Sequence, residues 1–485
     1  MSWYQSENLL KCLDLRNKIS LDSREAIEKF YDVESIAWKG KSLIELKKDL
    51  VCTNDFIPSR RTLNLYSGAI GNPFLLYYGM LIANNAESRK INPLGASVAV
   101  LAPEWEDKLK SIYRIYIKSL SDIKQLYPEK INKIIIPANF FKLSFGNVMT
   151  ALDNPEEYLK YSDPRKSLEN EVFNAGSAIE VKHDRNYEGI YNILNLIKQD
   201  VSVINNEEVR ELELIGQGLM LLDRIVKSNV KIIDDLIKGI TCDSKYDNIN
   251  RSDFLITTDI GPELDPYPED PSSRWDGYYV RYHKPVILSS VDSGVDYVHF
   301  GTLAKPGEVY GIGKVCKELG VPFAVSSIPG NNINAMNQSS HTPILLVISE
   351  LLKWYGSTFL YAGLNCRGPS LIADALNNIQ EFIDLLSKKG FKRERNSSYD
   401  LMMEDIEKYY PISYRSLNKV YPNSSHLSTN LLDNQILPVD IGKERYITYF
   451  NRLLEDHPYI KTIGGCCGID PTSYFDIFSE IVKNF

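Results

Sequence analysis

The segment Tyr459-Ile460-Lys461-Thr462-Ile463-Gly464-Gly465-Cys466-Cys467-Gly468, near the C-terminus, joins an apolar run to a cysteine pair set between glycines. The apolar run predicts a buried strand, so the cysteines follow the C-terminal tip of that strand. Adjacent cysteines do not easily bond to each other, because a disulfide needs Cα atoms about 4.4–6.8 Å apart and strict dihedral angles. The flanking glycines allow a sharp turn that aims both thiols at one metal ion. In a barrel of parallel strands, this end of the strand carries the chemistry.

Upstream of this segment, short β-branched runs alternate with longer segments of helical spacing. The predicted strands lie at 74–78, 133–137, 254–258, 295–300, 321–326 and 358–364, near 418 and near 459. This alternation predicts strand–helix units and a parallel sheet. Eight such units predict an α/β fold closed as a (β/α)8 TIM barrel. An open doubly wound sheet is the alternative, but no Gly-x-Gly-x-x-Gly follows a strand to favour a dinucleotide fold.

Three segments fall outside this alternation. Residues 1–70 precede the first predicted strand and are expected to form an N-terminal helical extension, which leaves 71–485 for the barrel. A large polar insertion is expected after the second strand, at about 143–203, as a lid or an oligomer contact. A second insertion is expected at about 391–416.

Composition argues against several classes of function. The chain has 485 residues, a net charge of −8 and a sequence pI near 5.5, and no run of basic residues stands out. These values argue against nucleic acid and anionic membranes as partners. No apolar run approaches the roughly 18 residues of a membrane-spanning helix, and no signal peptide is visible, so a cytoplasmic protein is expected. Seven cysteines in so long a chain predict reduced thiols or a metal site, not a disulfide framework.

A third cysteine, Cys366, ends another predicted strand and joins Cys466 and Cys467 as a candidate metal ligand. Three protein ligands with a fourth position open are the pattern of a catalytic zinc. Zinc held by three thiolates is a poor source of hydroxide but a good place to bind a thiol, which coordination deprotonates. The expected chemistry is attack by the zinc-bound thiolate on an electrophilic carbon. The structural alternative for the cysteine pair is two small buried residues in a tight turn.

Four motifs in the sequence resemble segments of one known family. They are Gly363-Leu364-Asn365-Cys366, Gly464-Gly465-Cys466-Cys467-Gly468, Val420-Tyr421-Pro422-Asn423-Ser424-Ser425 and Asp259-Ile260-Gly261-Pro262. Together they resemble the zinc-dependent homocysteine S-methyltransferase family. The resemblance is good over about 254–485 and weak over 72–142. It implies a (β/α)8 barrel, zinc bound by the three cysteines, and a divergent thiol methyltransferase.

Two acids of that family have no counterpart in this chain. The family's Asp-Gly-Gly, at the end of its first strand, aligns with Tyr78-Gly79-Met80, and its Glu-Thr aligns with Gly301-Thr302. In the family these acids help to hold the amino-acid part of homocysteine. An ammonium group needs an anion once it leaves water. Their loss therefore implies either a non-standard thiol as acceptor or another acid, such as Asp259, in their place.

The residues expected to bind substrate each have a structural alternative. Asn365 is placed to hydrogen-bond a ligand sulfur, or to serve as a turn residue. Tyr421 and Asn423 lie beside the zinc according to the resemblance, although Pro422 and Asn423 also suit a plain turn. Asp259 either contacts the acceptor or caps a turn. The full candidate set is Asn365, Tyr421, Asn423, Asp259, Thr302 and Tyr78.

The expected function is a zinc-dependent S-methyltransferase. A thiolate, homocysteine by resemblance, attacks the methyl group of an onium-type donor, so both substrates are small molecules. A homo-oligomer is compatible with the sequence. Two alternatives remain open at this point: a non-catalytic zinc- or thiol-binding or regulatory barrel acting through 143–203, and thiol redox sensing through Cys466 and Cys467.

Overall fold

The structure of the protein is a computed structural model. It describes residues 18–31, 43–50, 62–68, 95–140, 143–155, 187–263, 276–303, 305–329, 335–337, 340–387, 416–424, 441–466, 469 and 471–485.

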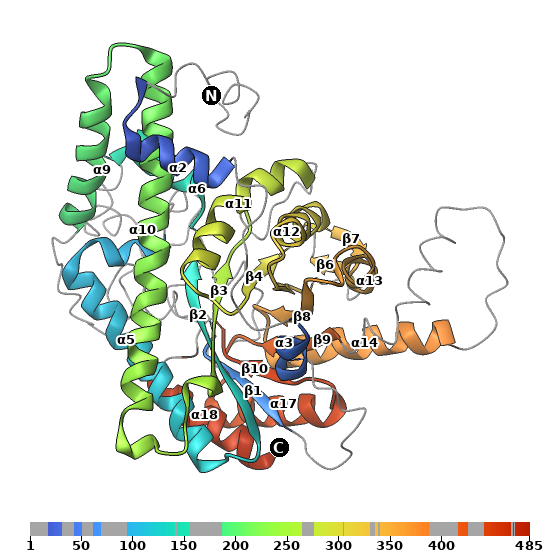
Figure 1. Ribbon diagram of the computed structural model, residues 1–485. Coiled ribbons are helices and arrows are strands. Elements are labelled where there is room, and N and C mark those ends of the chain that lie inside the picture. The colour runs from blue at the N-terminus through green and yellow to red at the C-terminus, as the bar shows by residue number, and fades with distance from the viewer. Residues whose placement is uncertain are drawn as a thin grey trace, which may run out of the picture.

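Eight parallel strands close into a barrel at the centre of the molecule (Figure 1). In ring order they are β1 (Leu63–Tyr66), β10 (Thr462–Gly464), β9 (Leu417–Tyr421), β8 (Phe359–Asn365), β5 (Phe323–Ser327), β4 (Val298–Leu303), β3 (Phe254–Ile260) and β2 (Ile131–Phe140). Every neighbouring pair is parallel, and β1 pairs with β10 to complete the ring. The prediction of a (β/α)8 barrel is confirmed.

The first barrel strand lies earlier than the sequence predicted. It is β1, inside the segment 1–70 that was expected to be a purely helical extension, so the barrel begins before residue 71. The run 74–78, which was taken for the first strand, lies outside the described residues. A continuous apolar run such as 74–78 is typical of a buried parallel strand, whereas β1 contains only four residues and includes a polar Asn64. Its place in the barrel is defined by pairing with β2 and β10, which no local pattern contains.

Helices surround the barrel on its outer side. They are α5 (Pro103–Leu126), α10 (Glu207–Thr241), α11 (Asp276–Asp292), α12 (Pro306–Glu318), α13 (Ile344–Tyr355), α14 (Pro369–Ser387), α17 (Lys443–Asp456) and α18 (Pro471–Asn484). A short antiparallel pair, β6 (Ala335–Asn337) and β7 (Ser340–Pro343), precedes α13. Among the described residues, no helix is long and apolar enough to cross a membrane.

The connection from β2 to β3 is the largest elaboration of the barrel. It contains α6 (Phe145–Asp153), α9 (Tyr187–Ser202) and the 35-residue α10, which runs along one side of the molecule (Figure 1). The Asn206 side chain caps α10 by accepting a hydrogen bond of 3.0 Å from the Val209 amide. Helix α10 contacts β2, β3, α5 and α11, while α6 and α9 pack against α10. The expected insertion at 143–203 therefore begins just before α6 and ends just after α9. Most of 391–416 lies outside the described residues.

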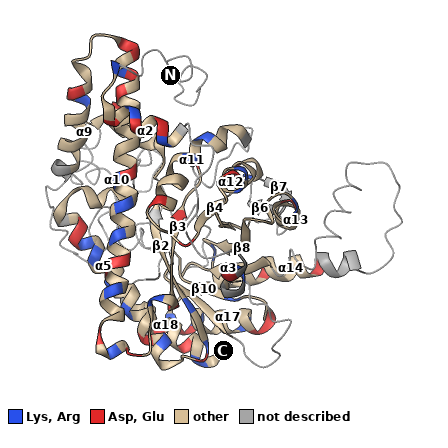
Figure 2. Cartoon of the chain, in the orientation of Figure 1, with Lys and Arg blue, Asp and Glu red and all other residues tan. Residues whose placement is uncertain are grey.

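Positions of basic and acidic residues are interspersed along the helices (Figure 2). On α10, Lys231 pairs with Asp235 at 2.5 Å and Lys238 with Asp234 at 2.6 Å, each one turn apart. Exposed pairs of this spacing contribute about 0.3–0.5 kcal/mol each. The outer surface of α10 thus favours the helix weakly, and the apolar face against the barrel provides most of the stabilisation.

Two helices precede β1 in the chain. Helix α2 (Leu21–Tyr31) packs on α10, and α3 (Leu43–Leu50) contacts both β2 and β8. Leu46 and Leu50 of α3 are fully buried against the barrel interior. The Lys47 ammonium donates to the carbonyl oxygen of Gly356 at 2.7 Å, and the Asn418 amide donates to that of Leu50 at 3.4 Å. Both positions lie at the N-terminal ends of strands, so α3 covers the end of the barrel opposite the cysteines.

Candidate functional site

The barrel interior is lined by aromatic and polar side chains from alternate strand positions. The rings of Tyr66 and Tyr421 lie 5.2 Å apart, Tyr66 and His299 5.7 Å apart, and His299 and Tyr421 6.0 Å apart. These residues belong to β1, β9 and β4, none of which are neighbours in the sheet. Contacts between them are therefore made across the interior of the barrel, which is packed and not a pore.

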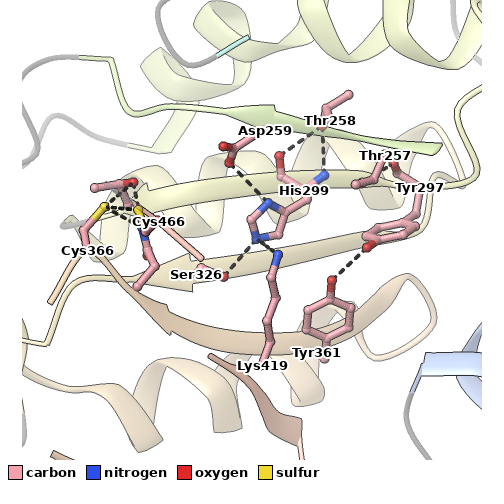
Figure 3. A network of polar contacts seen from close by, with 12 residues as sticks. Thr257, Thr258, Asp259, Tyr297, His299, Ser326, Tyr361, Cys366, Lys419 and Cys466 are labelled. Atoms are coloured by element: carbon pink, nitrogen blue, oxygen red, sulfur yellow. Dashed lines mark hydrogen bonds and ion pairs between the residues drawn. The ribbon is translucent and has the colours of Figure 1, made fainter. Parts of the chain in front are cut away.

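Two of the three predicted metal ligands meet at the C-terminal end of the barrel. Cys366 follows β8 and Cys466 follows β10, and their Sγ atoms lie 3.1 Å apart (Figure 3). A disulfide bond measures about 2.04 Å, so the sulfurs lie side by side without being bonded. Two sulfurs that each lie about 2.3 Å from one zinc ion can be at most ~4.6 Å apart. Cys467 lies outside the described residues, and no third His, Cys, Asp or Glu joins the pair within the described part of the chain.

The backbone at this end of the barrel is constrained. Cys366 has φ 55° and Thr302 has φ 64°, both in the left-handed region that β-branched threonine rarely adopts. The Asn365 amide donates to both residues, at 3.0 Å to Thr302 Oγ1 and 3.1 Å to Cys366 Sγ. Such a conformation costs on the order of 1–3 kcal/mol per residue and persists where surrounding contacts hold it. Asn365 provides one of those contacts and directs the Cys366 thiol toward Cys466.

The turn after β10 requires a glycine on each side of a close approach. Gly68 has φ +83°, and a Cβ atom there would lie 1.9 Å from the carbonyl oxygen of Gly465. The Cys466 amide donates to the carbonyl oxygen of Pro422 at 2.9 Å, and the Asn423 amide donates to that of Arg367 at 2.8 Å. These bonds join the segments after β8, β9 and β10 into one rigid rim that carries both cysteines.

Several buried polar atoms around this rim have no hydrogen-bond partner among the described residues. They are Asp259 Oδ1, the Tyr421 hydroxyl, Asn365 Oδ1, and both amide atoms of Asn423. Buried polar groups are nearly always paired, so a cluster of unpaired ones indicates a place where a ligand completes the hydrogen bonds. The predicted substrate-binding residues Asn365, Tyr421, Asn423, Asp259 and Thr302 all lie in this cluster or in contact with it. Tyr78 lies outside the described residues.

Asp259 and Tyr421 occupy the space beside Gly301. A Cβ atom on Gly301 would lie 2.5 Å from Asp259 Oδ1 and 3.1 Å from the Tyr421 hydroxyl. The carboxylate of β3 therefore reaches over β4 at the position where the sequence had indicated a lost acid. Burial first, and then the charge of Asp259, raises the pKa of Tyr421 well above its usual value. The Tyr421 hydroxyl keeps its proton and is a hydrogen-bond donor next to an acceptor carboxylate.

Sequence reasoning missed one group of this interior. Lys419 lies on β9, is fully buried, and has its Nζ atom 3.2 Å from the Tyr66 ring centroid and 3.2 Å from His299 Nε2. The available signal was the period of two in Leu417–Tyr421, which places Lys419 on the same face as Tyr421.

The model of the homocysteine S-methyltransferase family matches residues 218–474, more than half of the chain. The chain belongs to the homocysteine S-methyltransferase family. Its matched part contains six of the eight barrel strands and both described cysteines; the strands are β3, β4, β5, β8, β9 and β10. The protein is accordingly a methyltransferase. Strands β1 and β2, the helix α5 and most of the β2–β3 connection lie outside the match.

Solved structures of a homocysteine methyltransferase are similar to this chain at low identity. The metallated form of MmuM from Escherichia coli is 15% identical with a TM-score of 0.38, covering 53% of this chain and 71% of that one. Its oxidized form is 14% identical with a TM-score of 0.37, covering 55% and 71%. No curated protein matches the chain.

The residues present suit a zinc ion by their chemistry. Thiolates are the ligands that zinc prefers in such sites, and the two sulfurs are close enough to share one ion. The amide that donates to Cys366 Sγ is the kind of outer contact that orients a ligand. The donor set of this family member thus fits the metal that the sequence predicted.

Proposed function

We propose that this methyltransferase transfers a methyl group from an onium-type donor to a thiol, and that it depends on zinc held by Cys366, Cys466 and Cys467. The observation that carries the proposal is the 3.1 Å approach of the Cys366 and Cys466 sulfurs at the ends of two strands within the family match. When bound, the metal supplies a site that keeps the acceptor thiol deprotonated at neutral pH. The remaining arguments concern the protein's own side chains.

The acceptor in this proposal carries a protonated amine, as homocysteine does. Asp259 is 3% exposed and its Oδ1 has no hydrogen-bond partner among the described residues. The nearest ring nitrogen, His299 Nδ1, lies 3.5 Å away, so the buried carboxylate is incompletely satisfied, and an ammonium group from the substrate offsets that cost. Tyr421 donates its hydroxyl proton to a second polar atom of the same substrate. Asp259 would then perform the task of the acid that the sequence lacks at Gly301.

Transfer itself is a single displacement. The acceptor sulfur forms a bond to the methyl carbon while the bond from that carbon to the donor heteroatom breaks, and the electron pair leaves with the donor. A sulfonium or ammonium donor departs as a neutral molecule, so no acid is needed to protonate it. The chain's contribution is to exclude water and to align the two substrates above the rigid rim formed after β8, β9 and β10.

Two measurements test this proposal. Purified protein is expected to hold about one zinc ion per chain and to methylate homocysteine from S-methylmethionine or betaine, with loss of both properties on chelation. Cys366→Ser and Cys466→Ser are expected to lose the metal. Cys242→Ser is the matched control, because Cys242 is exposed at the end of α10.

Methyl transfer that continues unchanged after complete removal of the metal would contradict the zinc mechanism. Equal rates of methyl transfer to thiols with and without an amine would contradict the assignment of Asp259 to the acceptor. The second outcome would instead favour the non-standard thiol that the sequence left open.

A further inference from the structure

Deeper in the barrel than the cysteines, Asp259 belongs to a buried polar group whose three other members have no part in the chemistry described so far. It consists of Asp259, His299, Ser326 and Lys419, from β3, β4, β5 and β9 (Figure 3). His299, Ser326 and Lys419 are fully buried and Asp259 is 3% exposed. Burial of this many polar groups in a barrel core is unfavourable unless each has a partner.

Two glycines provide the space for this group. Gly301 leaves room for the Asp259 carboxylate, as described above. A Cβ atom on Gly363 would lie 2.6 Å from Ser326 Oγ and 3.0 Å from Lys419 Cβ. Ser326, Gly363 and Lys419 are also direct neighbours in the register of β5, β8 and β9. The barrel is therefore shaped around these side chains.

The hydrogen bonds define the protonation of the His299 ring. Burial first, and then the charge of Lys419, lowers the pKa of His299 to about 4, so the ring is neutral near pH 7. Its Nε2 atom lies 2.8 Å from Ser326 Oγ and 3.2 Å from Lys419 Nζ. A carboxylate can only accept, and Asp259 Oδ1 lies 3.5 Å from Nδ1. The ring proton then resides on Nδ1, and Nε2 accepts.

We propose that Lys419 and His299 are positioning residues that hold the carboxylate of Asp259 in place for the amine of the acceptor. Lys419 donates to His299 Nε2, and His299 Nδ1–H faces Asp259, so the three side chains form a relay from β9 through β4 to β3. This inference rests on the proposed function, because it assigns the relay to the same acceptor site. It goes beyond that function by assigning a role to two residues that touch neither the metal ligands nor the acceptor.

Burial of the Lys419 side chain destabilises the fold, which is not expected of a residue with a purely structural role. No carboxylate lies within 4 Å of its Nζ atom among the described residues, and its charge is compensated by the faces of Tyr66 and Tyr421, at 3.2 and 4.5 Å. Burial lowers the pKa of Lys419 well below its usual value. Replacement of such a lone buried cation by an apolar side chain of similar length stabilises a fold. Lys419→Met is thus expected to raise the melting temperature while weakening acceptor binding.

The test uses the full-length protein with its metal. His299→Asn places an amide donor near the position of Nδ1, whereas His299→Gln places it near Nε2. We expect His299→Asn to keep the KM for homocysteine within about threefold, and His299→Gln and Lys419→Met to raise it about tenfold or more, as for loss of one charged contact. The kcat is expected to change less than KM in every variant. Lys124→Met is the control, because the Lys124 ammonium is paired with Asp253 at 3.2 Å far from the site.

A second readout does not depend on methyl transfer. Nitrogen-15 spectra of histidine-labelled protein identify the protonated ring nitrogen, and the His299 signal is assigned by its loss in the variants. A proton on Nδ1 supports the relay, and a proton on Nε2 overturns it. Equal KM values for His299→Asn and His299→Gln also overturn it. Absence of methyl transfer in the wild-type protein would instead contradict the proposed function and leave the spectroscopic result to decide the relay.

Discussion

His299 should make the stability of the fold depend on pH in a defined window. The ring is fully buried, and its pKa falls from 6.5 to about 4 because burial penalises the charged form and Lys419 repels it. The unfolded chain binds a proton at this residue below about pH 6.5, whereas the folded chain binds one only below about pH 4. The free energy of unfolding therefore falls as the pH drops between these values, and His299 adds no further loss below pH 4.

The magnitude follows from the two pKa values. The pKa falls from 6.5 to about 4, which at ~1.36 kcal/mol per pKa unit amounts to about 3 kcal/mol in full. Between pH 7 and pH 4.5 the same two values give about 2 kcal/mol, because the loss is incomplete at pH 4.5. Since the group is fully buried, solvent does not screen this energy.

Chemical denaturation at pH 7 and pH 4.5 measures the effect in the wild type and in His299→Asn, which cannot titrate there. Over this interval the free energy of unfolding should fall by about 2 kcal/mol less in the variant than in the wild type. His457→Asn is the comparison, because His457 is also buried, with 2% of its surface exposed. Burial lowers the pKa of His457 as well, but there the charge of Asp456 opposes the shift. Parallel loss of stability in the wild type and His299→Asn would refute the argument that the fold holds this ring neutral.

Three further changes test the interior and the rim. Gly301→Ala brings a Cβ atom to 2.5 Å from Asp259 Oδ1, so it should lower the free energy of unfolding by about 1–3 kcal/mol and raise the KM for the acceptor. Gly239→Ala is the control: a Cβ atom there has nothing within 4 Å, and the change should stabilise α10 by up to about 1 kcal/mol. Denaturation curves and kinetics compare the two variants. Asn365→Ala removes the donor to Cys366 Sγ and should weaken zinc binding about 10–100-fold, as measured by competition with a chelator; unchanged affinity would show that the amide has no part in orienting the thiol. Leu46→Ala, in the helix that covers the opposite end of the barrel, should cost about 2–5 kcal/mol without loss of metal, and simultaneous loss of zinc would contradict the separation of the two ends.

Much of the barrel was predictable from local patterns. The strands β3, β4, β5, β8 and β9 coincide with strands predicted from the sequence. Most of these predictions rested on apolar runs, because a strand buried on both faces reads as a nearly continuous apolar segment. The convergence of Cys366 and Cys466 was also predictable, since both follow strands and the C-terminal ends of parallel strands meet at one rim. Neither prediction needed the order of strands around the ring.

The interior polar group was not predictable in the same way. Lys419 is a single charged residue in a short strand, and a charged residue in such a run reads locally as an exposed position. Its burial depends on Gly363 leaving space and on Tyr66 providing an aromatic face, and these residues lie on other strands. The role of Gly301 was likewise hidden, because the carboxylate beside it comes from β3.

The sequence by itself determined the closed parallel barrel and the pair of strand ends that carry the cysteines, because apolar periodicity and glycine turns act over a few residues. Tertiary structure alone decided which segment is the first strand and which side chains share the interior. Asn64 is paired with Thr462 across almost the whole chain, and the carboxylate of Asp259 occupies space left by Gly301 on a neighbouring strand. Contacts of this kind exist only after the ring has closed, because closure brings distant residues to within a few ångströms of each other.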